Sequence, residues 1–259
     1  MADKVPQNDR MYPVISASLI KNPSKFYAIP IAGFLVKVIM IIPVGIELMV
    51  LGIADLFVLV INSLIVLFTG KYWKVSYDLN LVLIRMGVKV NFFLTGLTNK
   101  YPGFSLTIED TFSVDIPFNK HPNRLFAIPI LGGIARIIAL IPYLIYSSVI
   151  GYASNIAVFF SWISVLVTGK YPETTFEITR DSNRISQATS AYLTGLSDTY
   201  PSFWVSMNHQ TLKIILIILG ALALIWNNVG KSSRKEQIQS QERMYQQELT
   251  PTQAPSSHY

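Results

Sequence analysis

The chain has 259 residues, of which 51% are hydrophobic and only 14% charged, and its mean hydropathy is +0.41. A soluble domain carries roughly 25% charged residues, so this composition argues against an ordinary soluble protein and indicates a membrane protein. The absence of cysteine excludes disulfides and thiolate metal sites. The basic residues behind the net charge of +6 flank apolar tracts, which favours anionic lipid headgroups over nucleic acid as their partner.

An internal repeat organises the chain. Shifting the sequence by 99 positions aligns residues 21–104 with 120–203 without a gap and gives 28 identities over 84 positions. Glycines, prolines and charged residues match as well as apolar ones, so shared hydrophobicity does not account for the alignment. We therefore predict two tandem membrane modules, residues 12–104 and 112–203, after a polar N-terminus over residues 1–11.

Each module is expected to begin with a short extended stretch and to continue with a long apolar tract. The extended stretches are Val14–Ile20 and Phe112–Asn119, and the second alternates apolar and polar residues throughout. The apolar tracts, Phe26–Thr69 and Leu125–Thr168, have 44 residues each. That is twice the roughly 20 residues that one helix needs to cross a bilayer.

A proline interrupts each apolar tract. Pro43 and Pro142 occupy the same repeat position, and a proline inside a helix removes a backbone donor. An unbroken helix over the whole tract would be about 66 Å long, against about 30 Å of hydrocarbon. We therefore predict that each tract folds as a helical hairpin.

Both tracts end in Thr-Gly-Lys-Tyr and lead into a further helix. Glycine suits a helix C-terminus, lysine complements the helix dipole there, and tyrosine favours the lipid–water interface. In the second module the helix that follows separates charged from apolar residues, as an amphipathic helix at a membrane surface does. Six residues of these elements are predicted at the interface: Lys71, Tyr72, Arg85, Lys170, Tyr171 and Arg184.

A last apolar segment completes the predicted fold. Residues 208–228 predict a C-terminal transmembrane helix in which Lys213 is the only lysine, arginine or acidic residue. Residues 229–259 predict a polar, largely disordered tail, with a brief helix through Lys235–Leu249 before the disorder. The predicted fold class is an all-α membrane protein. It has two tandem helical-hairpin modules, each with an interfacial amphipathic helix, and a C-terminal transmembrane helix.

The second module resembles a known family. The resemblance is carried by Arg136, Trp162, the Thr-Gly-Lys-Tyr-Pro element, Arg184 and the Tyr-Pro-Ser-Phe run that starts at Tyr200. This pattern resembles the bacterial membrane family catalogued as domain of unknown function 4389. The first module resembles it more loosely, with Ser63 in place of Trp162, so we predict two tandem copies. The resemblance implies topology only, since the family carries no established activity.

Charged residues inside the apolar tracts are the candidate site residues. They are Lys37, Glu47, Asp55 and Arg136. Charges are costly within a bilayer and mark either functional sites or paired structural groups. Lys37 and Arg136 share a repeat position, and a hairpin would allow Lys37 to pair with Glu47. A structural role, an ion or proton path and a partner-binding role are all open at this point.

The sequence offers no pattern for catalysis or cofactor binding. The Gly-Lys pairs at residues 70–71 and 169–170 lack the preceding glycine and the following Ser or Thr of a phosphate-binding P-loop. The three histidines are widely separated and have no ligand at metal-binding spacing. We therefore predict no enzymatic activity, no cofactor and no metal.

These observations favour a non-enzymatic membrane accessory or scaffold protein that belongs to a larger membrane complex or lipid assembly. The alternative is a small transporter or channel with a pathway between the two repeats, and an enzyme acting on lipids is a third possibility. The predicted partners are membrane lipids and other integral membrane proteins or a second copy, without nucleic acid. The basic flanks predict a multi-pass protein of the cell (inner) membrane with a cytoplasmic N-terminus.

Overall fold

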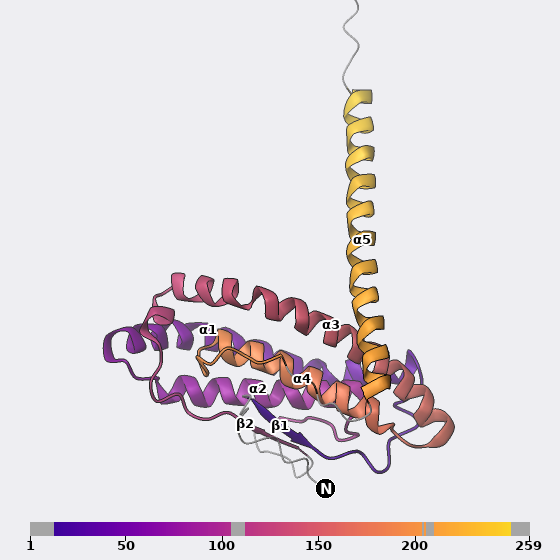
Figure 1. Ribbon diagram of the computed structural model, residues 1–259, viewed down its shortest axis with the longest axis horizontal. Helices are drawn as coiled ribbons and strands as arrows, with labels where there is room; N and C mark the ends of the chain where they lie inside the picture. The colour runs from indigo at the N-terminus through magenta and orange to yellow at the C-terminus, as the bar shows by residue number, and fades with distance from the viewer. Residues whose placement is uncertain (1–12, 105–111, 204, 206–209, 250–259) are drawn as a thin grey trace, which may run out of the picture.

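The computed structural model describes residues 13–104, 112–203, 205 and 210–249, and this part of the chain is predominantly helical. In chain order its elements are β1 (Val14–Ala17), α1 (Ala32–Thr69), α2 (Lys74–Thr95), β2 (Phe112–Asp115), the 3-10 helix η1 (Arg124–Ala127), α3 (Leu131–Thr168), α4 (Glu173–Leu193) and α5 (Gln210–Leu249) (Figure 1). Helices α1 and α3 and the first part of α5, to Lys231, are long and apolar enough to cross a membrane. The predicted class of all-α membrane protein is confirmed, and both short strands lie within the predicted extended stretches.

The two apolar tracts do not fold as hairpins, and this prediction was wrong. Each forms one unbroken helix of 38 residues with its proline inside. α1 packs antiparallel to α2 on both sides of Pro43. Lys37 Nζ donates to the Leu94 carbonyl at 3.3 Å, and Asn62 Oδ1 accepts from the Trp73 amide at 2.9 Å. The prediction rested on the length of a helix that crosses the bilayer, whereas packing on α2 sets the course of α1.

Each module is instead a pair of antiparallel helices, one long and apolar and one shorter and more polar. α1 pairs with α2 and α3 with α4, and equivalent helices begin 99 residues apart, the offset that aligns the sequences. Both long helices follow the same strained turn. Ile31 and Ile130 have φ values of 66° and 64°, and the next amide donates to the carbonyl of the preceding proline at 2.8 and 2.7 Å. This is a γ-turn, a rare conformation for a β-branched residue.

A glycine lets the chain pass close to itself just after each γ-turn. A Cβ on Gly33 would lie 2.6 Å from the Tyr27 carbonyl oxygen, and one on Gly132 would overlap the Phe126 carbonyl oxygen. A side chain at either position would push the start of the long helix away from the loop before it. These two glycines therefore fix how each long helix enters its module.

The two modules face each other across an approximate two-fold axis. β1 and β2 pair antiparallel with Ile15 opposite Val114, and these two residues are 99 positions apart, the offset of the sequence repeat. A residue that pairs with its own equivalent lies on the symmetry axis, as in the interface of a two-fold homodimer. The hydrogen bonds of Tyr72 and Tyr171 between the modules, given below, follow the same relation.

A buried apolar core fills the space between the modules. Phe92 of α2 and Phe112 of β2 meet edge to face at its centre, with ring centroids 5.3 Å apart. Burial of these aromatic and β-branched side chains stabilises the association of the modules. Both strands, α2, α3 and α4 contribute, and the buried members include Ile15, Ile84, Val88, Phe92, Phe112, Val114, Ile116, Val165, Phe176 and Ala191.

α5 projects away from the layer formed by α1 to α4 (Figure 1) and crosses α3 closely. A Cβ on Gly220 would lie 2.6 Å from the Val149 carbonyl oxygen, so glycine allows the two backbones to touch, as small residues do between membrane helices. A buried ion pair, Lys213 Nζ to Glu177 Oε2 at 2.5 Å, connects the base of α5 to α4. The sequence marked Lys213 as a lone charge but gave no sign of its partner.

α5 is longer than the transmembrane helix predicted over residues 208–228. It continues as one helix to Leu249 and includes the brief helix predicted through Lys235–Leu249. The polar segment is rich in Gln, Glu and Lys, which extend an existing helix readily. The end of the tail and the predicted polar N-terminus over residues 1–11 lie outside the described residues.

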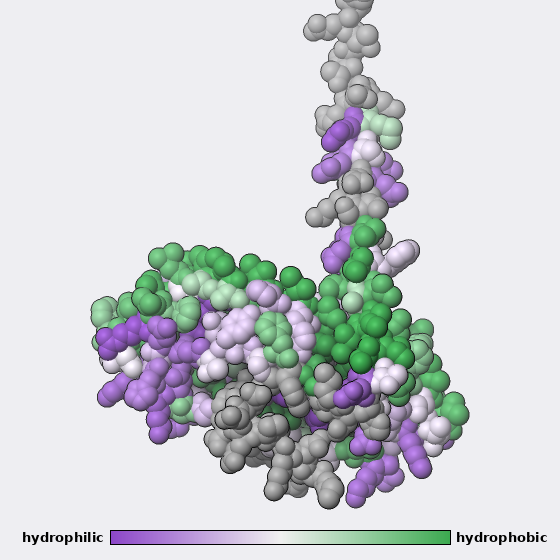
Figure 2. Space-filling view, viewed as in Figure 1, coloured by the Kyte–Doolittle hydropathy of each residue, from purple (hydrophilic) through white to green (hydrophobic). Residues whose placement is uncertain are grey.

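None of the charged side chains of the two long helices, α1 and α3, is exposed. In α1, Lys37 and Asp55 are buried and Glu47 is half-buried, and the only charged residue of α3, Arg136, is buried. Figure 2 shows apolar side chains gathered along the side of the body from which α5 rises and hydrophilic ones along the opposite side. The molecule therefore has one apolar side and one polar side.

Candidate functional site

Lys37 is enclosed by aromatic rings in the first module. Its Nζ lies 5.6 Å from the ring centroid of Tyr27 and 5.7 Å from that of Phe93, and it donates to the Leu94 carbonyl at 3.3 Å. Tyr27 comes from the loop before the γ-turn, and Phe93 and Leu94 come from the end of α2. Lys37 is only 1% exposed, and the cation–π contacts and the carbonyl thus compensate for the loss of water around its charge.

Arg136 occupies the equivalent cage in the second module. Its guanidinium carbon lies 4.7 Å from the ring centroid of Phe126 and 5.1 Å from that of Tyr192, the repeat equivalents of Tyr27 and Phe93. Nη1 donates to the Tyr192 carbonyl at 2.6 Å. The cage is therefore built twice on one plan, with a different cation in each copy.

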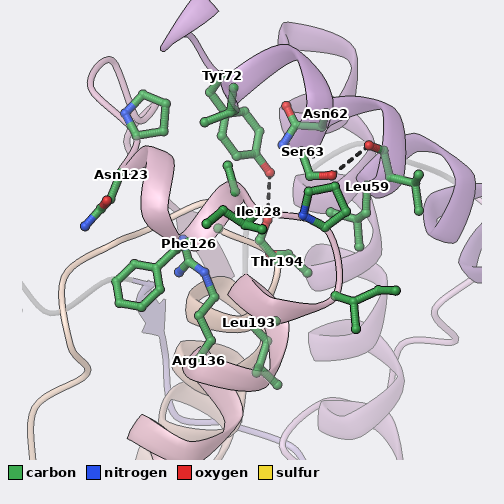
Figure 3. Close-up of a pocket in the computed structure, with 18 residues that line it drawn as sticks. Leu59, Asn62, Ser63, Tyr72, Asn123, Phe126, Ile128, Arg136, Leu193 and Thr194 are labelled. Carbon is green, nitrogen blue, oxygen red and sulfur yellow. Dashed lines mark hydrogen bonds between the residues drawn. The ribbon is translucent and has the colours of Figure 1, made fainter. Parts of the chain in front are cut away.

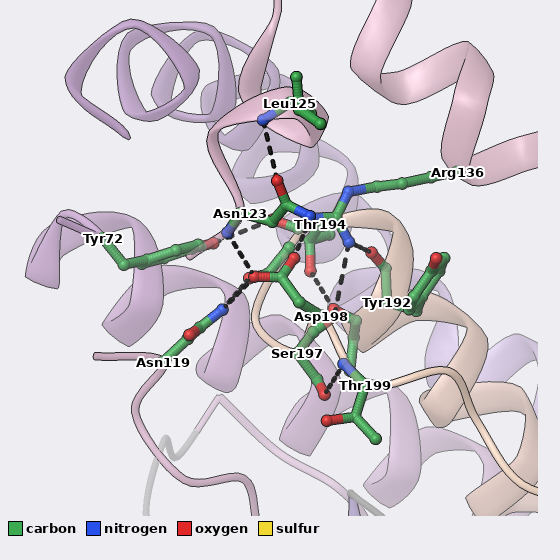
Figure 4. A network of polar contacts seen from close by, with 12 residues as sticks. Tyr72, Asn119, Asn123, Leu125, Arg136, Tyr192, Thr194, Ser197, Asp198 and Thr199 are labelled. Carbon is green, nitrogen blue, oxygen red and sulfur yellow. Dashed lines mark hydrogen bonds and ion pairs between the residues drawn. The ribbon is translucent and has the colours of Figure 1, made fainter. Parts of the chain in front are cut away.

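A carboxylate is present in the second cage only. Asp198 forms an ion pair with Arg136, and its other oxygen accepts from Asn119 Nδ2 and from the Asn123 amide, both at 2.8 Å (Figure 4). In the first module Asn99 stands at the repeat position of Asp198 and accepts from a loop amide at 3.0 Å. Neither residue was predicted from the sequence. A signal was present, because each is the second residue after the repeated Leu-Thr-Gly-Leu element.

The remaining charges of α1 are not paired as predicted. Lys37 does not pair with Glu47, because α1 is one unbroken helix through Pro43 and ten residues of helix, about 15 Å, separate the two along its axis. Asp55 instead accepts from Asn80 Nδ2 of α2 at 2.8 Å. Glu47 Oε2 is buried without a hydrogen-bond partner. The four candidate charges therefore do not come together in one site.

The predicted interfacial residues divide into exposed lysines and buried residues. Lys71 and Lys170 are exposed at the ends of α1 and α3, as an interfacial position requires. Arg85 is half-buried and its Nη2 lies 3.5 Å from the Val114 carbonyl oxygen. Arg184 is only 8% exposed, and burial lowers its pKa. The partly polar face of α4 is thus covered by other parts of the protein, which its amphipathic pattern did not indicate.

Tyr72 and Tyr171, also predicted at the interface, are buried within the protein. Tyr72 Oη donates to the Thr194 carbonyl at 2.9 Å, and Tyr171 Oη lies 3.4 Å from the Thr95 carbonyl oxygen. Each tyrosine thus joins the end of one long helix to the other module. Burial is the main cause that raises the pKa of each phenol to about 12.

A pocket of about 410 Å³ opens where the first long helix meets the second module (Figure 3). The C-terminal part of α1 forms one wall, including Val60, Asn62 and Ser63. η1, the start of α3 and the end of α4 form the other, including Ile130 and Arg136. The volume falls within the roughly 300–1,000 Å³ that is typical of ligand pockets. This pocket therefore has room for a ligand.

The repeat places a counterpart of this pocket in the other half, where it is almost filled. The counterpart, lined by Lys37, Gly96 and Tyr171, has about 10 Å³, the space of about one water molecule. Trp162 lies there, with its ring centroid 5.9 Å from that of Phe34, and Ser63 takes its repeat position in the open pocket. Two differences thus accompany the closing of the second pocket: Trp162 in place of Ser63, and Phe34 in place of Gly133, which lines the open pocket.

The fold and these sites define a two-module membrane protein with an approximate internal two-fold axis and a caged cation in each half. Residues 133–205 match the profile of the family described as Domain of unknown function (DUF4389). We predicted two tandem copies, and the profile finds one, which contains most of α3, all of α4 and Asp198. No curated protein and no solved structure matches the chain. Among the described residues no group of three or more His, Asp or Glu could hold a metal ion.

Proposed function

We propose that this protein is a non-enzymatic integral membrane accessory or scaffold protein, associated with a larger membrane complex or lipid assembly. The observation that carries the proposal is the uncharged exposed face of α1 and α3, which continues onto the base of α5. A contiguous apolar surface of this extent is stable against lipid or against the apolar surface of a partner, not against water. The predicted partners are therefore membrane lipids and other integral membrane proteins or a second copy.

The same observation suggests how the protein lies in the bilayer. A rise of ~1.5 Å per residue makes α1 and α3 about 57 Å long, nearly twice the hydrocarbon thickness of about 30 Å. α2 and α4 pack against them and carry charged residues along their length. In our proposal α1 and α3 lie along the cytoplasmic surface of the cell (inner) membrane of a bacterium with their apolar faces in the bilayer, and α5 crosses it.

Single cysteines test this arrangement cleanly, because the chain has none of its own. Lys25 and Lys71 are exposed at the two ends of α1, and Lys231 lies beyond the apolar part of α5. Cysteines at Lys25 and Lys71 should both react with a membrane-impermeant maleimide only from the cytoplasm, and one at Lys231 only from outside. Labelling of Lys25 and Lys71 from opposite sides would mean that α1 crosses the membrane.

The alternative function, a transporter or channel between the repeats, has less support. The space between the modules holds the apolar core, and Asp55 and Arg136 are bonded to groups of the protein itself. Glu47, with its unpartnered buried oxygen, is a group that favours a conduit. Purified protein in sealed vesicles should leave proton and alkali-cation gradients intact. Saturable flux that disappears in Glu47→Gln would support the conduit and reject the scaffold.

Photo-crosslinking tests the scaffold proposal directly. Phe57 of α1 and Phe160 of α3 are 68% and 53% exposed on the apolar face. A photoreactive amino acid at either position should crosslink in native membranes to the same membrane protein or to a second copy. The same group in place of Lys74, exposed on α2, serves as the control for random collisions. Absence of a protein crosslink above that control from either position would count against a scaffold.

A further inference from the structure

The open pocket between α1 and the second module is the site that the membrane arrangement leaves unexplained. We propose that it binds one acyl chain of an anionic phospholipid, with the phosphate of the headgroup at Arg124 and Lys71. The proposal rests on the proposed embedding of α1 and α3 in the bilayer and adds to it a specific lipid site.

The shape of the pocket favours a large apolar occupant. The two pockets share their plan, so the side chain of Trp162 shows what the site accommodates in the closed copy. Ser63 has only a hydroxyl group there, and this group is turned back to the carbonyl of Val60 at 2.8 Å. About 410 Å³ of largely apolar space is left, which a flexible hydrocarbon chain can fill.

The mouth of the pocket opens among side chains of the apolar face. Val60 and Ile130 line it and are 58% and 80% exposed, and Leu193 at its other border is 40% exposed. If α1 and α3 lie in the bilayer, lipid chains surround this mouth and water does not. An acyl chain can therefore enter sideways from the membrane without crossing a polar barrier.

Two basic side chains, Lys71 and Arg124, are chain neighbours of Tyr72 and Asn123, which line the pocket. The Arg124 guanidinium packs over Gly70, where a Cβ would lie 2.6 Å from Nη2, and Lys71 follows in the chain. Both side chains are exposed, and Asn123, the neighbour of Arg124, lines the pocket. Two cations beside an apolar pocket match the phosphate of an anionic lipid. Arg124 and Lys71 correspond to Lys25 and Lys170 in the repeat, so charge alone does not distinguish the two pockets.

Native mass spectrometry of the full-length protein in detergent, titrated with phosphatidylglycerol, tests the proposal. The unmodified protein should bind one phosphatidylglycerol tightly, and Ser63→Trp, which copies the closed pocket, should bind it at least tenfold more weakly. Equal binding by a folded Ser63→Trp protein would overturn the proposal. If the tryptophan prevents folding, Ser63→Leu fills part of the same space and should weaken binding several-fold, and unchanged binding by this variant would be equally decisive.

The closed pocket provides the reciprocal test. Trp162→Ser should open the second site and raise the number of tightly bound phosphatidylglycerol molecules from one to two. A folded Trp162→Ser protein that still binds one molecule would remove the argument from shape and refute the proposal. Lys71→Gln with Arg124→Gln should abolish the preference for phosphatidylglycerol over phosphatidylcholine, and an unchanged preference would reject the assigned phosphate site.

Extraction separates failure of this proposal from failure of the proposed function. The unmodified protein and Ser63→Trp should both stay in membranes washed at high pH without detergent. Release of the unmodified protein would reject membrane embedding and the lipid site with it. If both proteins remain in the membrane and bind phosphatidylglycerol equally, only the lipid site is rejected.

Discussion

The two halves of this protein place a cation in the same cage but compensate it differently. Lys37 is held by two aromatic rings and a carbonyl beside Asn99, whereas Arg136 has the same surroundings and the carboxylate of Asp198 as well. The comparison shows that the cage geometry does not depend on an ion pair. The guanidinium of Arg136 has more hydrogen-bond donors than the ammonium group of a lysine. The Asp198 carboxylate and the carbonyls of Tyr192 and Ser197 accept from it.

The largest effect is expected when the carboxylate is removed from the second cage alone. Asp198→Asn leaves the charge of Arg136 buried without its counter-ion, and we expect a loss of about 3 kcal/mol in the free energy of unfolding. Arg136→Lys together with Asp198→Asn recreates the cation and amide of the first cage. This double variant should be clearly more stable than Asp198→Asn. Chemical unfolding in detergent micelles measures the free energy of unfolding of both variants. If the loss in the double variant equals the sum of the losses in the two single variants, the two cages are not interchangeable.

A smaller loss is expected at the close approach before each long helix. Gly132→Ala places a methyl group on the Phe126 carbonyl oxygen, so the backbone must shift, and we expect destabilisation of about 2 kcal/mol. Gly133→Ala is the matched control, because a Cβ at that position meets no atom within 4 Å. It should leave the thermal midpoint unchanged or raise it slightly. Equal midpoints for the two variants would contradict the close approach.

The hydrogen bonds between the modules should differ slightly in strength. Tyr72→Phe removes a bond of 2.9 Å to Thr194 and should cost about 1 kcal/mol. Tyr171→Phe removes a longer contact of 3.4 Å to Thr95 and should cost less. Thermal unfolding of the two single variants gives the comparison. A larger loss for Tyr171→Phe would reverse the assignment of the stronger contact.

The smallest effect near neutral pH comes from the ionisation of these two phenols. Their pKa is raised to about 12 in the folded protein, above the value of about 10 in the unfolded chain. The folded state therefore binds more protons between these values, and stability should be constant up to pH about 10 and fall toward pH about 12. The double variant Tyr72→Phe, Tyr171→Phe should show a shallower fall. An identical pH profile for the variant and the unmodified protein would exclude these phenols as the cause.

The sequence predicted the class of the molecule and the order of its parts well. Apolar tracts, extended stretches and the offset of 99 residues are local properties of the chain, and the structure has its helices at that offset. The prediction failed for the hairpins at Pro43 and Pro142. A proline shows where a helix is weakened, but the contacts of Lys37 and Asn62 with α2 decide whether it continues.

The sites depended still more on tertiary structure. The sequence by itself determined which charged residues lie in apolar tracts, because that is a matter of composition. It also determined that Ser63 and Trp162 occupy the same repeat position, because that follows from the alignment. Only the folded chain placed Asp198 against Arg136 and the end of α1 against the start of α3, and so made one pocket open and the other closed. Burial depends on what packs against a residue, and the two-fold arrangement brings together residues that the sequence holds far apart.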